Sequence, residues 1–159
     1  MCQRYLKDAR ADLEFPLRPA AKRGDVDAIT RLLDGGAEVD QAEEDGKTPL
    51  LVACALGHVD VVRLLLDKGA DVNQARNDDT TALYIVCQNG YVDTARLLLE
   101  NGAAVDKEDK DGATPMAIAK SNGHAAIVEL LEDHVLKLKH PLHAAARRGD
   151  AAEIARLLD

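Results

Sequence analysis

Four glycines in this chain, Gly24, Gly57, Gly90 and Gly123, are spaced 33 residues apart. Each lies inside a near-copy of one pattern, which is clearest over residues 45–73. A repeated unit of this length buries its apolar face only against its neighbours, so we expect an elongated array rather than one globular core. The composition agrees: 47% of the residues are hydrophobic but only 3% are aromatic, which indicates a thin interface of small aliphatic side chains.

Each interior unit carries signals for two helices joined by a tight turn. Thr48, Thr81 and Thr114 lie where a hydroxyl can accept hydrogen bonds from free N–H groups at a helix start. Pro49 and Pro115 follow at the first helical position, where a missing N–H costs nothing. The first helices are predicted at about 49–56, 82–89 and 115–122, and the second helices at about 59–68, 92–101 and 125–133.

This order of helix, tight turn, helix and projecting β-turn connector resembles the ankyrin repeat, which has a 33-residue period and a Thr-Pro-Leu-His-x-Ala signature. The resemblance covers about residues 16–134 and returns in 141–159. It implies an all-α fold, an ankyrin-repeat solenoid of stacked helix-turn-helix units with projecting β-turn connectors. The departures are local: the signature His survives only as His143, and Ala82 replaces a proline. Asp79 replaces a turn glycine, so the second connector is expected to turn differently.

The repeats divide the chain into three parts. These are an N-terminal tail (1–15), four repeats (16–44, 45–77, 78–110 and 111–134), and a segment (135–159) with a short linker and a partial fifth repeat or C-terminal cap. Two arrangements of the last unit remain open: it stacks on the fourth repeat, or it opens a second array. The need to cover Leu157 and Leu158 favours stacking, although the same surface could recruit a second copy of the chain.

The net charge of −8 is concentrated in the three connectors. Residues 37–47 carry five acids and one base, residues 70–80 three acids and one base, and residues 103–113 four acids and two bases. Nucleic acid is a poor partner for such a surface. No apolar run approaches the ~20 residues needed to cross a bilayer, so no membrane association is expected. An odd number of cysteines and the lack of a secretory signal predict an intracellular, cytoplasmic location.

No motif in the sequence is typical of an active site. Residues 46–48 resemble the end of a phosphate-binding loop, but Gln41 stands where that motif needs glycine. His140 and His143 have no cysteine near them and only His134 as a possible third ligand, so a zinc site is not predicted. We therefore expect no enzyme activity, no cofactor and no metal.

Two other pairs of residues have a structural interpretation. Cys54 and Cys87 occupy the same position in successive units and are predicted to be buried side chains too far apart for a disulfide. His58 and His124 follow the turn glycine, where a side chain can tie the turn to a neighbouring backbone.

The resemblance implies a protein–protein interaction module with a concave binding face, made of connector tips and the exposed side of the first helices. The acidic connectors predict a protein partner with basic residues. Leu56 and Tyr84 are the apolar candidates for anchors. An alternative function is a structural or assembly segment that self-associates through its terminal repeats. The predicted partner-binding residues are Lys22, Arg23, Glu43, Glu44, Asp45, Lys47, Leu56, Arg76, Asn77, Asp78, Thr80, Tyr84, Gln88, Asn89, Lys110, Asp111, Ser121 and Asn122.

Overall fold

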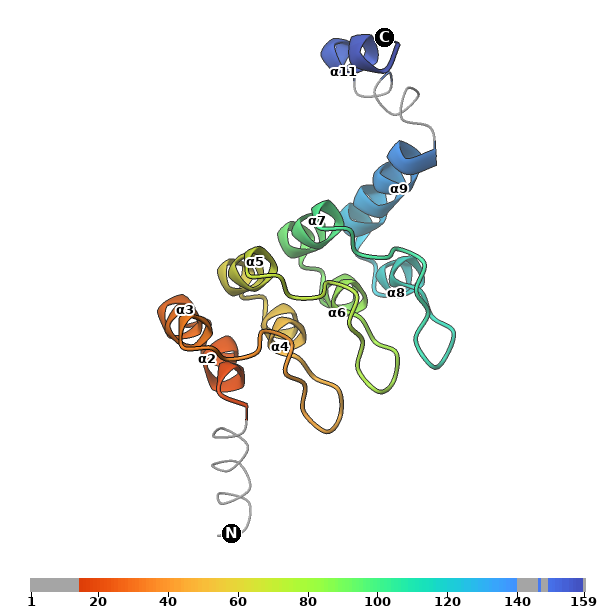
Figure 1. The fold of residues 1–159 in the computed structure, drawn as a ribbon. Coiled ribbons are helices and arrows are strands. Elements are labelled where there is room, and N and C mark those ends of the chain that lie inside the picture. The colour runs from red at the N-terminus through yellow and green to blue at the C-terminus, as the bar shows by residue number, and fades with distance from the viewer. Residues whose placement is uncertain (1–14, 140–145, 147–148, 159) are drawn as a thin grey trace.

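The helices of the repeats lie in two rows (Figure 1). The computed structural model describes residues 15–139, 146 and 149–158, and these contain helices and turns but no strand. The first row is α2 (Leu17–Arg23), α4 (Pro49–Leu56), α6 (Ala82–Asn89) and α8 (Pro115–Ser121), in contact in that order. The second row is α3 (Val26–Asp34), α5 (Val59–Asp67), α7 (Val92–Glu100) and α9 (Ala125–Lys139). The all-α repeat solenoid is therefore confirmed.

The helix starts are those the threonines predicted. The hydroxyl oxygens of Thr48, Thr81 and Thr114 accept hydrogen bonds from the N–H three residues on, at 3.2–3.3 Å. The helices α4 and α6 have the predicted bounds, and α8 is one residue shorter. Gly57 and Gly90 end α4 and α6 with φ near +74° and +81°, a conformation that favours glycine.

The core runs as a continuous layer between successive repeats. Leu50, Val62, Leu65 and Leu98 are among its fully buried side chains. Cys54 and Cys87 are also buried and free, as predicted. Burial in apolar surroundings raises the pKa of the Cys87 thiol to about 12, and it raises the pKa of Cys54 as well.

The histidines after the turn glycines join each repeat to the one before it. His58 Nε2 hydrogen-bonds to the carbonyl of Lys22 at 3.2 Å, and His124 Nε2 to the carbonyl of Gln88 at 3.0 Å, which confirms their predicted role. In the first repeat the same position is Asp25, whose carboxylate accepts from the Ala28 N–H at 2.9 Å. In the first repeat this position thus caps the second helix of its own repeat, whereas His58 and His124 bind the backbone of the preceding repeat.

The second helix of the fourth repeat is longer than predicted. We expected it to end near residue 133, but α9 continues to Lys139. The equivalent helices end before Gly69 and Gly102, and the corresponding residue in the fourth repeat is Val135. Without a glycine to adopt the left-handed conformation, the helix runs on through residues 135–139, which sequence analysis assigned to a linker.

The outer face of the fourth repeat carries two charged side chains at positions that are apolar in the second and third repeats. Lys120 takes the place of the buried Cys54 and Cys87. Glu132 likewise replaces the more buried leucines of α5 and α7 and forms an ion pair with Lys120 at 3.4 Å. A charged pair on this face is better hydrated than covered by another repeat, so the face is suited to the end of a stack.

The last unit lies apart from the stack. Figure 1 shows α11 (Ala151–Leu158) beyond the far end of α9, away from the paired helices. The Asp150 carboxylate accepts from the Glu153 N–H at 3.0 Å, the same cap that Asp25 gives the first repeat. Stacking on the fourth repeat and the opening of a second array both stay predictions for this unit. The side chains of Leu157 and Leu158 lie outside the described residues, as do His140 and His143.

The expected difference in the second connector is wrong. Asp79 has φ +63°, in the same left-handed region as Gly46 at +83° and Gly112 at +78°. Each of these residues donates its N–H to the carbonyl three residues before it, at 2.9–3.0 Å. The connector keeps its turn because aspartate tolerates this conformation better than most residues with a Cβ.

Asp79→Gly should therefore stabilise the protein. Glycine adopts the left-handed conformation without steric cost, so we expect the free energy of unfolding to rise by up to about 1 kcal/mol in a urea titration. Asp79→Ala is the control, since it removes the same charge but keeps a Cβ. A gain of equal size for the alanine variant would show that charge, not backbone conformation, is responsible.

Candidate protein-binding face

The connectors are hydrogen-bonded to one another. The Asn77 N–H donates to the carbonyl of Asp45 at 3.1 Å, and the Asn77 side chain donates to the carbonyl of Glu44 at 2.8 Å. One repeat further on, the Lys110 N–H donates to the carbonyl of Asp78 at 3.1 Å. The connector tips are therefore held in register, and a partner that binds them loses little freedom in ordering them.

A second link joins the connectors close to the helices. Asn73 donates from its amide to the carbonyl of Gly102 at 3.2 Å, and its amide oxygen accepts from the Ala104 N–H at 2.8 Å. In the previous repeat the carboxylate of Asp40 accepts from the Asp71 N–H at 3.0 Å. Successive connectors are thus fixed at both base and tip.

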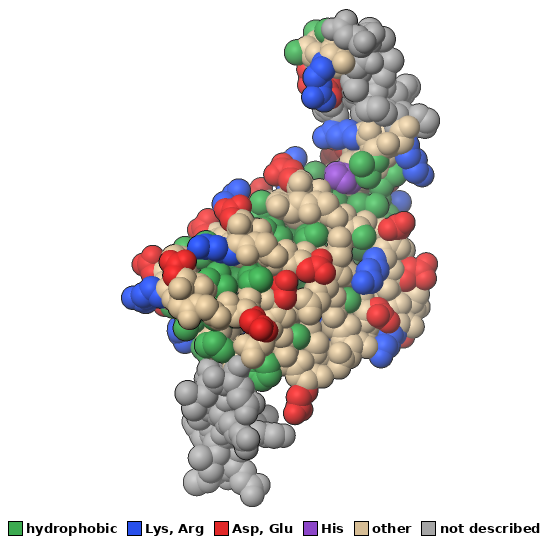
Figure 2. Space-filling model, in the orientation of Figure 1, with side chains coloured by type: hydrophobic (Ala, Val, Ile, Leu, Met, Phe, Trp, Pro, Cys, Tyr) green, Lys and Arg blue, Asp and Glu red, His purple; other side chains and the backbone are tan. Residues whose placement is uncertain are grey.

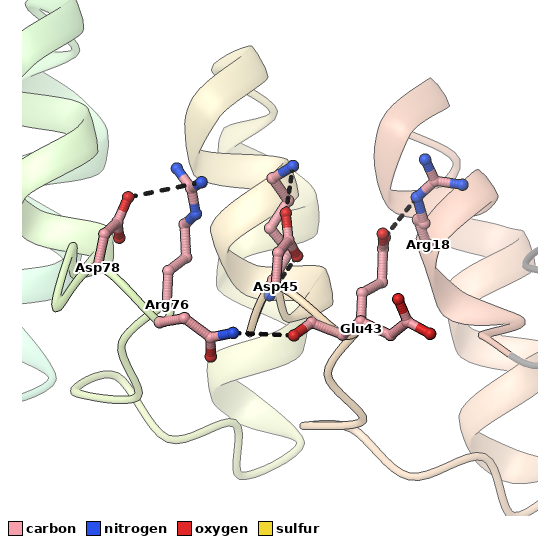
Figure 3. A network of polar contacts seen from close by, with 8 residues as sticks. Arg18, Glu43, Asp45, Arg76 and Asp78 are labelled. Carbon is pink, nitrogen blue, oxygen red and sulfur yellow. Dashed lines mark hydrogen bonds and ion pairs between the residues drawn. The ribbon is translucent and has the colours of Figure 1, made fainter.

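Several acidic side chains of the connectors already form ion pairs within the chain (Figure 3). Arg18 on α2 pairs with Glu43 on the first connector, and Arg76 pairs with Asp78 at 3.5 Å. Lys47 pairs with Asp45 at 2.7 Å. On the face in Figure 2, acidic side chains are interspersed with basic ones rather than gathered into one patch. These pairs are partly exposed and stabilise modestly, but they leave fewer acids for a partner.

Three connector aspartates also brace their own turns. Asp45, Asp78 and Asp109 accept hydrogen bonds from N–H groups two to four residues on, at 2.8–3.2 Å. Partial burial would raise the pKa of Asp45 and of Asp78, but hydrogen bonds from Lys47 and Thr80 outweigh it and lower both values. The Ala113 N–H is the main cause of the lowered pKa of Asp109.

Tyr84 is not available as an anchor. Only 9% of its surface is exposed, and its hydroxyl lies near the carboxylate of Asp109 on the following connector. Burial and the nearby carboxylates raise the pKa of this phenol. Thr80 is buried to the same degree. The signal that could have shown this is the repeat register, because Leu51 occupies the position of Tyr84 in the second repeat and is also buried.

The other half of the face is a row at the C-terminal ends of the first helices, which we call the helix-end row. All its side chains are exposed, and Leu56 is the largest apolar one, with 47% of its surface accessible. The Asn89 amide donates to the carbonyl of Ala55 at 3.3 Å, and the Asn122 amide to that of Gln88 at 2.9 Å. The row comprises Lys22, Arg23, Ala55, Leu56, Gln88, Asn89, Ser121 and Asn122.

The predicted site residues therefore fall into three groups by exposure. The exposed group is Lys22, Arg23, Glu44, Leu56, Asn77, Gln88, Asn89, Lys110, Asp111, Ser121 and Asn122. The half-buried group is Glu43, Asp45, Lys47, Arg76 and Asp78, and the buried group is Thr80 and Tyr84. Sequence reasoning missed that the half-buried acids pair internally and that the side-chain amides of Asn77, Asn89 and Asn122 link repeats.

The described residues hold no group of three or more His, Cys, Asp or Glu side chains that could bind a metal ion. A hollow of about 380 Å³ lies against the outer face of the fourth repeat, lined by Ala119, Val128 and Glu132 among others. Lys120, His124 and Glu129 also line it.

Comparison with known families decides the assignment. The family model described as ankyrin repeats (3 copies) matches residues 17–109 and again residues 83–159. The chain belongs to the ankyrin repeat family. Ankyrin repeats are generally protein–protein interaction modules and are typically not enzymes. A search of curated proteins found no match. Within the part of this ankyrin repeat protein that the structure describes, no helix has the length and apolarity needed to span a membrane.

The connector aspartates predict a loss of stability in acid. Because the pKa values of Asp45, Asp78 and Asp109 are lower in the folded protein, their stabilisation is complete above their ordinary value near 3.8. It is lost as the pH falls through the lowered values. Carboxyl NMR titration should show the pKa of Asp109 rising in Tyr84→Phe, which lacks the donating hydroxyl. No rise would show that the Tyr84 hydroxyl contributes nothing there.

Proposed function

We propose that this chain is a non-enzymatic module that binds a protein partner on the concave face formed by the connector tips and the helix-end row. The observation that carries the proposal is the hydrogen-bonded ladder of connectors, which fixes the tips in register. Rigid presentation of exposed side chains favours recognition of another macromolecule. We further propose an intracellular setting, in keeping with the two free buried cysteines.

The acids that remain for a basic partner are fewer than the sequence suggested. Glu44, Asp79 and Asp111 are exposed and form no ion pair with any residue that the structure describes. Glu43 and Asp78 brace the connectors, so reversing them would disturb the face itself. The charge that attracts basic residues of a partner is therefore assigned to these three acids near the connector tips.

Charge reversal at the tips tests this function. In Glu44→Lys with Asp111→Lys, capture of a partner from cell extract should fall and its association rate should slow about tenfold at low salt. Added salt should reduce the difference between this variant and the unaltered chain. The matched control is Asp67→Lys with Glu100→Lys, the same charge change on the second helices. Equal effects of the two double variants would contradict binding at the connector tips.

Self-association is the second candidate, and one exposed side chain favours it. Leu138, on the extended end of α9, has 68% of its surface accessible. An apolar side chain there could pack against a second copy of the chain. Light scattering would then show a mass that rises with concentration, and Leu138→Glu would abolish the rise. A constant monomer mass would exclude this role.

A further inference from the structure

The helix-end row differs in character from repeat to repeat. Its first-repeat members, Lys22 and Arg23, are both basic, while its second-repeat members are Ala55 and the exposed Leu56. The third and fourth repeats contribute only neutral polar side chains. The row therefore changes from basic to apolar to neutral polar along the array. This order can fix the position and the orientation of a bound partner.

The two basic side chains are left unpaired by the part of the chain that the structure describes. They form no ion pair with any of the described residues, whereas Arg18 on the same helix pairs with Glu43. Bases at a helix C-terminus can compensate the helix dipole, but α4 and α6 have none in their last turn. Among the first helices only α8 has another base in its last turn, the single Lys120, so the end of α2 carries the most positive charge and is open to a partner.

The backbone beneath the basic pair is rigid. His58 holds the carbonyl of Lys22, and the ring of His58 lies against the turn at Gly24, where an added Cβ would come within 2.8 Å of it. On the next repeat, the Asn89 amide holds the carbonyl of Ala55, directly before Leu56. The backbone that carries the basic pair and the backbone that carries Leu56 are both fixed before a partner binds, which favours tight and selective binding.

We propose that this corner of the concave face takes an amphipathic helix of a protein partner, with an acidic residue on Lys22 and Arg23 and an apolar residue on Leu56. Stacked helices lie about 10 Å apart, and two turns of an α-helix rise about 11 Å, so residues seven apart match the spacing. Charge complementarity argues for this occupant, because the site is basic although the chain carries −8 overall. The inference rests on the proposed function and names the chemistry of its partner.

A displayed library of helical peptides, selected on the full chain, tests the inference. Enriched peptides should carry Asp or Glu seven residues from a large apolar residue. Lys22→Glu with Arg23→Glu should weaken such a peptide at least about tenfold, and replacing its acid by lysine should restore binding to this variant. Leu56→Ser should weaken it comparably. Arg63→Glu with Arg96→Glu is the matched control: the same charges change on exposed residues of α5 and α7.

The outcomes separate this inference from the proposed function. If bound peptides depend on Glu44, Asp111 or Asn89 but not on Lys22, Arg23 or Leu56, the inference is overturned while concave-face binding stands. If binding depends only on Arg63 and Arg96, both fail. A selection that enriches no peptide, or peptides without the acidic–apolar spacing, also contradicts the inference.

Discussion

Gly46→Ala should lower the free energy of unfolding by about 3 kcal/mol, because the alanine would suffer both backbone strain and a clash. Gly46 has φ +83°, and an added Cβ would lie 2.8 Å from the Asn77 side chain and 2.9 Å from its backbone nitrogen. That nitrogen cannot move away without breaking its hydrogen bond to the carbonyl of Asp45. The cost is thus a direct measure of how closely the first two connectors interlock.

Gly112→Ala is the matched control for this prediction. Gly112 occupies the same repeat position with φ +78°, but an added Cβ would meet nothing within 4 Å. Only the conformational cost applies, so we expect about 1 kcal/mol in the same urea titration. Equal costs at the two positions would show that the connectors do not constrain one another.

Leu98→Ala should have an effect of similar size through the core. Leu98 is fully buried on α7, and removing its side chain should cost about 3 kcal/mol. The third repeat packs on both the second and the fourth. Removing the Leu98 side chain should therefore also uncouple these two repeats and lower the denaturant dependence of unfolding. Ile29→Ala, equally buried but in the first repeat, touches one interface only. It should fray the end of the array and leave the unfolding of the later repeats unchanged.

Circular dichroism and a probe in the fourth repeat would separate these two variants. Leu98→Ala should lower the denaturant midpoint of both signals and give two resolved steps. Ile29→Ala should lower mainly the midpoint seen by circular dichroism. Coincident, equally cooperative transitions for both variants would contradict the repeat-by-repeat account of stability.

The fold could be predicted because its signals are local. A threonine that caps a helix and a glycine that ends it lie within one turn of the atoms they contact, so Thr48 and Gly57 fixed the bounds of α4. The sequence also contained the signal for the longer α9, although we did not use it: Val135 stands where Gly69 and Gly102 follow the preceding second helices. Asp79 was misread because the missing glycine was given more weight than aspartate's tolerance of the left-handed region.

The binding face could be predicted only in outline. Register places residues on a row, but it does not show which charges are already paired. Arg18 on α2 reaches Glu43 on the first connector, and Tyr84 on α6 lies near Asp109 on the third connector. Both contacts join a first helix to the connector that follows it, so they depend on how the chain folds back within a repeat, which register alone does not show. The number of connector acids free to meet a partner was therefore overestimated. The basic corner at Lys22 and Arg23 became a candidate contact only when its neighbours in the structure showed it to be unpaired.

The most direct test of the central claim is NMR chemical-shift mapping of the full chain with its captured protein partner. The claim is that stacked repeats present one fixed face to that partner. We expect shifts confined to the helix-end row and the connector tips, with the connector N–H groups protected from exchange before and after binding. Shifts centred on α3, α5 and α7, or connectors that exchange freely in the absence of partner, would contradict it.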